Sequence, residues 1–113
     1  MPLKYSRKGF TDETLLHLYD QLAKPRLIEE KMLNLLRQGR ISKWLSGIGQ
    51  EAISVGAACA LHPEELVFTM YRNLGVFTAR NMPLDRMFCQ WQGKRLGYTK
   101  GRDRSFHFGA LEH

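Results

Sequence analysis

Apolar residues recur at helical spacing through the first third of the chain. The apolar positions are Leu15, Leu18, Leu22, Ile28, Met32, Leu35 and Leu36. Residues at this spacing share one face of an α-helix, so the pattern predicts an amphipathic helix. Thr11 is suited to cap its start, because Asp12 and Glu13 follow in the first turn, where the helix dipole favours negative charge. Gly39 is expected to end the helix, and Pro25 predicts either a kink or a second helix that begins at the proline.

The rest of the chain predicts shorter elements. Residues 50–61 are mostly small and predict a helix packed on several sides, ended by Pro63. Residues 66–70 form a short apolar run that is typical of a buried strand. Helical periodicity resumes over residues 73–80, and Pro83 opens a last helix that extends to Gln92. The predicted fold class is therefore mainly α, with one or two short strands.

The composition is that of a globular protein, with 43% apolar and 25% charged residues. No run of about 18 apolar residues occurs, which argues against a membrane span, and the first residues lack the apolar segment of a secretory signal. Cys59 and Cys89 lie in apolar segments without metal-ligand spacing, and both are expected to be buried free thiols. Free thiols and the missing signal favour a cytoplasmic location.

The net charge of +6 and the isoelectric point near 9.6 raise the question of nucleic-acid binding. The basic residues are spread along the chain, with small groups at residues 4–8 and 100–104, and no nucleic-acid-binding motif accompanies them. An ordinary solvated surface is the favoured interpretation. A non-enzymatic basic helical module for interaction or nucleic-acid binding stays open as an alternative.

Tyr71 and Arg72 are the strongest candidates for chemistry. An arginine makes bidentate, charge-assisted contacts to a phosphate, and a neighbouring tyrosine can donate one more hydrogen bond. An isolated Tyr-Arg pair is more often a tyrosine at the edge of the core beside a solvated arginine. Here the pair follows a predicted strand and precedes an Asn-Leu-Gly turn, and this position favours phosphate binding.

Several strings along the chain resemble a known family. They are Gly49-Gln50-Glu51-Ala52, Tyr71-Arg72-Asn73-Leu74-Gly75 and Lys100-Gly101-Arg102-Asp103-Arg104-Ser105-Phe106-His107. Their order and spacing resemble the N-terminal part of the α subunit of thiamine-diphosphate-dependent 2-oxo acid dehydrogenases, the E1 components. The segment Gly39-Arg40-Ile41-Ser42 is most similar to the branched-chain, 2-oxoisovalerate members. The resemblance implies that residues 1–110 form a single helical N-terminal segment of an α/β thiamine-diphosphate-binding fold; residues 111–113 resemble an expression tag.

The resemblance also implies roles for particular residues. Tyr71 and Arg72 correspond to the pair that contacts the diphosphate of the cofactor. Leu74 stands where pyruvate-type relatives commonly have His, which favours a more apolar substrate, and Trp44 lies in the segment that reaches toward the substrate. Arg102, Ser105 and His107 lie on a loop near the cofactor cleft. A flexible basic loop with a surface histidine is the competing interpretation for that loop.

The implied activity is oxidative decarboxylation of a branched-chain 2-oxo acid with thiamine diphosphate and Mg²⁺, followed by transfer of the acyl group to a lipoyl carrier. The implied partners are an E1 β subunit, or a fused β half, and a lipoyl-bearing E2 acyltransferase. The magnesium ligands of the family come further along, so this segment alone is expected to be inactive and, with apolar surface exposed, to self-associate. A pyruvate or acetoin dehydrogenase α subunit is the alternative enzyme.

Overall fold

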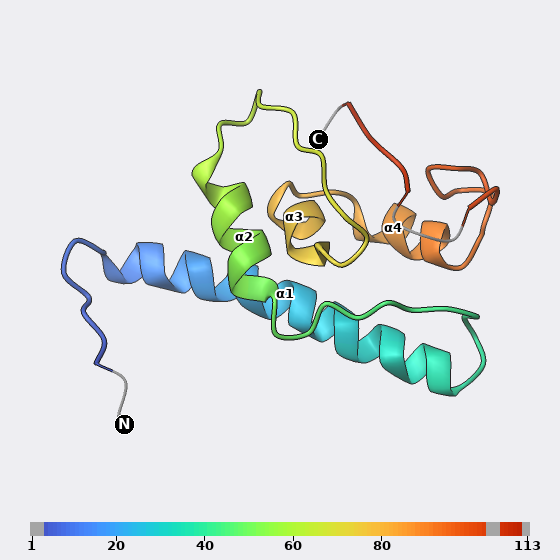
Figure 1. Cartoon of the computed structure of the whole chain (residues 1–113), viewed down its shortest axis with the longest axis horizontal. Helices are drawn as coiled ribbons and strands as arrows, with labels where there is room; N and C mark the ends of the chain where they lie inside the picture. The colour runs from blue at the N-terminus through green and yellow to red at the C-terminus, as the bar shows by residue number, and fades with distance from the viewer. Residues whose placement is uncertain (1–3, 104–106, 112–113) are drawn as a thin grey trace.

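Four helices make up the regular structure of the part that the computed structural model describes, residues 4–103 and 107–111. They are α1 (Asp12–Arg37), α2 (Glu51–Ala60), α3 (Leu74–Ala79) and α4 (Leu84–Trp91). The long helix α1 underlies the molecule, α2 crosses it, and α3 and α4 lie on the same side of it as α2 (Figure 1). Each predicted helix is confirmed. No helix in the described ranges is both long and apolar enough to cross a membrane.

Both ends of α1 follow the sequence prediction. The Thr11 hydroxyl accepts a hydrogen bond from the backbone N–H of Thr14 at 3.1 Å, which caps the helix. At the other end Gly39 has a φ of +69°. Its N–H donates to the carbonyl of Leu36 and that of Arg40 donates to Leu35, the paired bonds of a Schellman motif.

The helix continues through Pro25 without a break, so the prediction of a second helix starting at the proline is wrong. Pro25 is fully buried within the packed face of α1. Packing of an amphipathic face supplies most of the stability of a helix in a protein, and here it offsets the one backbone donor that proline lacks.

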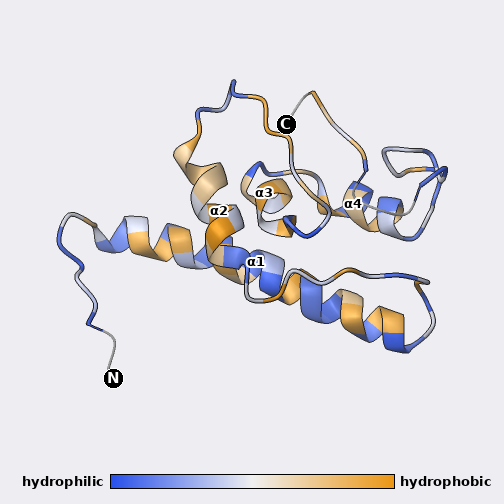
Figure 2. Ribbon diagram, in the orientation of Figure 1, coloured by the Kyte–Doolittle hydropathy of each residue, from blue (hydrophilic) through white to orange (hydrophobic). Residues whose placement is uncertain are grey.

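The core lies between the second half of α1 and the helices α3 and α4. Its buried residues are Ile28, Met32, Leu35, Ile41, Leu74, Phe77, Met82, Met87 and Trp91. Polar and apolar residues alternate along α1, whereas α2 is coloured mostly toward the apolar end of the scale (Figure 2). The residues of α1 before Gln21 are exposed or half-buried, so this helix contributes to the core with its second half.

Helix α2 packs on one face, against α1 and α3, and not on several sides as its small residues predict. Ser54, Val55 and Ala58 are buried, whereas Ile53 is 73% exposed. Small side chains permit close approach, but no other element of the described chain covers the second face. Cys59 on this helix is exposed and Cys89 on α4 is half-buried; both are free thiols, as predicted, but neither is fully buried.

Residues 66–70 form no strand, and the described residues contain none. Leu66 is 73% exposed, Phe68 96% and Met70 67%, so the prediction of a buried strand is wrong. A strand needs a neighbour that pairs with its backbone. The described chain offers no such neighbour, and the segment runs as a loop between α2 and α3 (Figure 1).

Candidate functional site

Tyr71 and Arg72 form a turn immediately before α3. Tyr71 is half-buried and packs against the core, whereas Arg72 is exposed. The guanidinium carbon of Arg72 lies 5.5 Å from the centroid of the Tyr71 ring, within cation–π range. Among the described residues no carboxylate forms an ion pair with Arg72. The turn therefore presents an available cation beside a phenol.

Helix α2 fixes this turn through Asn73. The Asn73 side-chain oxygen accepts from the backbone N–H of Met70 at 3.1 Å, and its amide donates to the Ser54 hydroxyl at 3.3 Å. Gly75 then packs against α2, because a Cβ placed on it would lie 2.9 Å from the Cβ of Ser54. The start of α3 is thus held directly against α2.

Helix α1 fixes the same turn through Glu29. This glutamate is 2% exposed, and its carboxylate accepts from the indole N–H of Trp44 at 2.6 Å and from the backbone N–H of Gly47 at 2.8 Å. A Cβ on Gly47 would lie 2.3 Å from the carbonyl oxygen of Arg72. The loop after α1 is therefore packed between Glu29 and the backbone of Arg72.

Glu29 is the residue that the sequence reasoning missed. A signal was present, because Glu29 lies in the apolar face of α1 between Ile28 and Met32. A carboxylate in such a face is seldom buried without partners. Its partners, Trp44 and Gly47, are 15 and 18 residues away, and local pattern does not identify contacts at that separation.

Trp44 and Leu74 both adjoin the core next to the turn. The Trp44 ring meets Trp91 edge to face, with centroids 5.1 Å apart, and is partly buried. Leu74 is 3% exposed and belongs to the core itself. The structure therefore brings four predicted site residues to one region. Two of them, Tyr71 and Arg72, form the turn, while Trp44 and Leu74 lie against or within the supporting core.

The entry to α2 carries an ion pair. The Arg26 guanidinium donates to the Glu51 carboxylate at 2.7 Å, and the backbone N–H of Gly49 donates to the same carboxylate at 2.9 Å. The hydrogen bond from Arg26 is the main cause that lowers the pKa of Glu51, and the same contact raises the pKa of Arg26. Glu51 thus joins α1 to α2, in addition to its favourable place at a helix N-terminus.

The remaining predicted residues lie on the loop after α4. Gln90 is fully buried and holds this loop: its amide donates to the carbonyl of Asp103 at 2.9 Å, and its oxygen accepts from the backbone N–H of Thr99 at 2.9 Å. Arg102 and His107 are both exposed, and the His107 imidazole lies 3.8 Å from the Asp103 carboxylate. Ser105 lies outside the described residues.

The same loop returns to the core at Phe108. The Phe108 ring stacks on Tyr98 at 4.7 Å and lies 5.3 Å from Phe77 of α3. The guanidinium carbon of Arg86 covers the Tyr98 ring at 4.1 Å. This aromatic packing links the basic loop to the helix that begins at the Tyr71–Arg72 turn.

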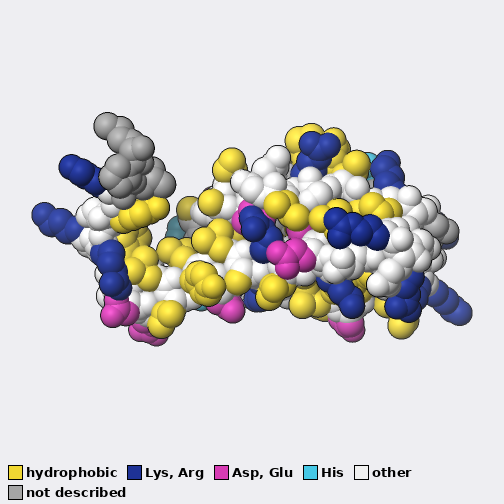
Figure 3. Space-filling view, turned by 90° about the horizontal axis from the view of Figure 1, so that it is seen from below, with side chains coloured by type: hydrophobic (Ala, Val, Ile, Leu, Met, Phe, Trp, Pro, Cys, Tyr) yellow, Lys and Arg dark blue, Asp and Glu magenta, His cyan; other side chains and the backbone are white. Residues whose placement is uncertain are grey.

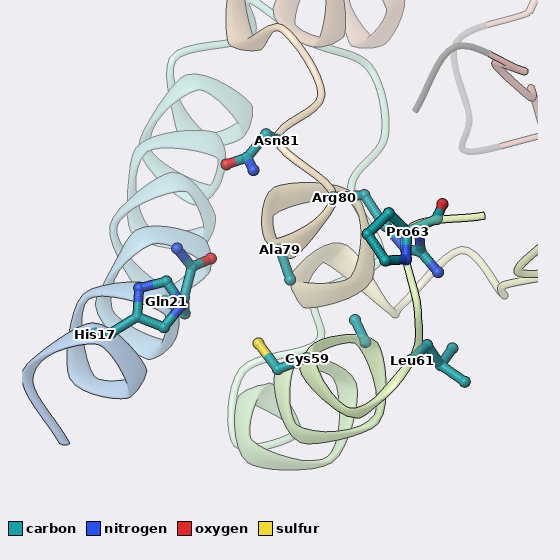
Figure 4. Close-up of a pocket in the computed structure, with 9 residues that line it drawn as sticks. His17, Gln21, Cys59, Leu61, Pro63, Ala79, Arg80 and Asn81 are labelled. Atoms are coloured by element: carbon teal, nitrogen blue, oxygen red, sulfur yellow. Dashed lines mark hydrogen bonds between the residues drawn. The ribbon is translucent and has the colours of Figure 1, made fainter. Parts of the chain in front are cut away.

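A separate cavity of about 420 Å³ opens between the first half of α1 and the ends of α2 and α3. His17 and Gln21 face it from α1, Cys59 from α2, and Asn81 from the segment after α3 (Figure 4). Arg80 points to its rim, where the guanidinium donates to the carbonyls of Pro63 and Glu65. Neither Tyr71 nor Arg72 lines this cavity. The described part of the chain holds no group of three or more His, Cys, Asp or Glu suited to a metal ion.

Comparison with known families defines the class. Residues 19–112 match the family model for the dehydrogenase E1 component; this range holds most of α1, all of α2, α3 and α4, and the turn and the loop described above. The chain belongs to this family.

The relatives are α subunits of one kind of E1 component. The chain is 33% identical to 2-oxoisovalerate dehydrogenase subunit alpha 1 of Arabidopsis thaliana, over 88% of this chain and 21% of the relative. It is 35% identical to the human α subunit, over 88% of this chain and 22% of the relative, and 32% identical to that of Caenorhabditis elegans, over 92% and 24%. The chain thus spans less than a quarter of these relatives. No solved structure matches the chain.

The cytoplasmic prediction is wrong, because the relatives are named as mitochondrial proteins. The prediction rested on the free thiols and on the polar character of the first residues of the chain. A chain that spans so small a share of its relatives does not report on a leader sequence.

Proposed function

We propose that the chain is the N-terminal part of the α subunit of a thiamine-diphosphate-dependent dehydrogenase acting on a branched-chain 2-oxo acid. The family match over residues 19–112 and the three relatives described above, each named as an α subunit of 2-oxoisovalerate dehydrogenase, support this proposal. In the whole subunit the four helices would belong to an α/β cofactor-binding fold. An E1 β subunit and a lipoyl-bearing E2 acyltransferase are the expected partners.

Within that enzyme, Tyr71 and Arg72 are proposed to bind the diphosphate of the cofactor. The observation that carries this assignment is the exposed guanidinium of Arg72, which no described carboxylate neutralises, on a turn that two helices hold in place. These residues suit a diphosphate, because an arginine and a phenol side by side offer several donors to phosphate oxygens. Thiamine diphosphate, when bound, supplies the electron sink for decarboxylation. Mg²⁺ would be held by residues outside this chain.

An apolar substrate is favoured over pyruvate or acetoin. Trp44, which is partly buried, supplies apolar surface next to the turn, and Leu74 lies behind it in the core. The names of the relatives point to a branched-chain substrate. Arg102, Ser105 and His107 stay candidates for the loop that lines the cleft. Lys and Arg side chains are scattered among apolar patches on the face shown in Figure 3 and form no continuous basic stripe there, so this face does not favour the nucleic-acid alternative.

The test measures cofactor binding by the full-length subunit assembled with its β partner. Arg72→Ala is compared with wild type in a titration of thiamine diphosphate at saturating Mg²⁺, with 2-oxoisovalerate decarboxylation as a second readout. Loss of a hydrogen bond to a charged group should weaken cofactor binding by about 1.5–3 kcal/mol. Tyr71→Phe, which keeps the ring, should weaken binding less.

Arg37→Ala is the matched control, because Arg37 is an exposed arginine in the last turn of α1, outside the Tyr71–Arg72 turn. It should leave the affinity unchanged. Equal affinities for wild type and Arg72→Ala would contradict the diphosphate assignment. Decarboxylation of pyruvate in preference to 2-oxoisovalerate would favour the alternative enzyme.

A further inference from the structure

Glu29 is a buried carboxylate in the apolar face of α1, and the helix itself does not require a charged residue at this position. Two donors from a loop, the Trp44 indole and the Gly47 backbone, each bond one of its two oxygens, at 2.6 and 2.8 Å. A buried glutamate costs free energy unless its oxygens are paired. An apolar residue at this position would pack against Ile28 and Met32 without such a requirement.

The loop that Glu29 holds reaches the backbone of Arg72. A Cβ on Gly47 would lie 3.4 Å from a Glu29 carboxylate oxygen and 2.3 Å from the Arg72 carbonyl oxygen. Gly47 therefore fills the space between the two residues, and any side chain there would displace one of them. Glu29, Gly47 and Arg72 also line one small cavity of about 10 Å³, too small for more than a single water molecule. Glu29, Gly47 and the backbone of Arg72 are therefore closely packed, with almost no empty space between them.

We infer that Glu29 is a positioning residue for Arg72: it fixes the Gly47 loop, and the loop fixes the backbone from which the Arg72 side chain extends. This inference rests on the proposed function, in which Arg72 binds the diphosphate. The binding group must be held in place before the ligand arrives, because the cost of ordering it would otherwise reduce the affinity. Glu29 itself touches neither cofactor nor substrate.

The test uses the full-length subunit assembled with its β partner, and the probe is thiamine diphosphate titrated at saturating Mg²⁺. Glu29→Met keeps the length of the side chain and removes both acceptors. Cofactor affinity should fall about ten- to hundredfold, as for outer residues that orient the ligands of a metal site. The decarboxylation rate at saturating cofactor should stay within about twofold of wild type, since the bound state is the same. Glu30→Met, at the exposed neighbouring position, should change neither quantity.

Further variants test whether Glu29 acts on Arg72 through the loop that contains Gly47. Gly47→Ala leaves Glu29 intact and pushes directly on the Arg72 carbonyl, so it should weaken cofactor binding and serves as the test if Glu29→Met fails to fold. Trp44→Phe removes one donor and keeps the Gly47 contact, so it should have the smaller effect on affinity. The tryptophan emission of the cofactor-free protein should shift in Glu29→Met, because the Trp44 indole loses its acceptor.

The double variant Glu29→Met with Arg72→Ala separates positioning from general stability. If Glu29 acts through Arg72, the double variant binds the cofactor no more weakly than Arg72→Ala alone. Independent losses that multiply, or an unchanged affinity in Glu29→Met while Arg72→Ala is weakened, would overturn the inference and leave the proposed function standing. If Arg72→Ala itself binds normally, the proposed diphosphate contact fails and this inference fails with it.

Discussion

Gly75 lies where α3 meets α2, and the structure leaves no room there for a side chain. A Cβ at this position would lie 2.9 Å from side-chain atoms of both Ser54 and Val55. Gly75→Ala should therefore lower the free energy of unfolding by about 1–3 kcal/mol, the usual cost of overpacking a core. Gly56→Ala is the control: Gly56 lies in α2 with nothing within 4 Å, and alanine should stabilise that helix by about 0.5–1 kcal/mol. Denaturant unfolding measures both, and equal effects of the two substitutions would contradict this account of the α2–α3 contact.

Single residues with local roles are those that the sequence predicts best. Thr11 and Gly39 act within their own turns, so the cap and the helix end follow from the neighbouring residues. Glu29 is different, because its partners lie far along the chain. The burial of Cys59 was also mispredicted, since an apolar segment does not show which of its faces another helix will cover.

Among the elements, the loop after α4 depends on one buried side chain. Gln90→Leu would leave the Thr99 N–H without its acceptor and would remove one donor from the Asp103 carbonyl, which also accepts from the Thr99 hydroxyl. An unsatisfied buried polar group costs about 1–3 kcal/mol, so this loop should loosen and become more accessible to trypsin, which cuts after its lysine and arginine residues. Gln92→Leu is the control, because the Gln92 amide donates only to the Phe88 carbonyl of its own helix. Equal rates of loop cleavage in the two variants would contradict the anchoring role of Gln90.

The helices could be predicted from the sequence because period and caps are local properties. The segment of residues 66–70 could not, for a physical reason: its apolar, β-branched composition favours a strand, but a strand forms only beside another strand. Leu66, Phe68 and Met70 are exposed, whereas Val67 and Thr69 between them are half-buried, and this is the alternation of a strand that has one covered face. Composition predicted a buried strand, and the absence of a partner among the described residues left the segment as a loop.

At the scale of the whole molecule, the exposed residues at 66–70 leave apolar surface without cover, and this argues for association of the 113-residue chain on its own. Phe68 is 96% exposed, so Phe68→Glu places a charge in the centre of this surface without touching the core. It should reduce the concentration dependence of the sedimentation coefficient, while the free energy of unfolding changes by no more than about 0.5 kcal/mol. Leu96→Glu, at a position 76% exposed in the loop after α4, adds the same charge elsewhere and should leave association unchanged. If both variants reduce association equally, the association does not depend on the segment of residues 66–70.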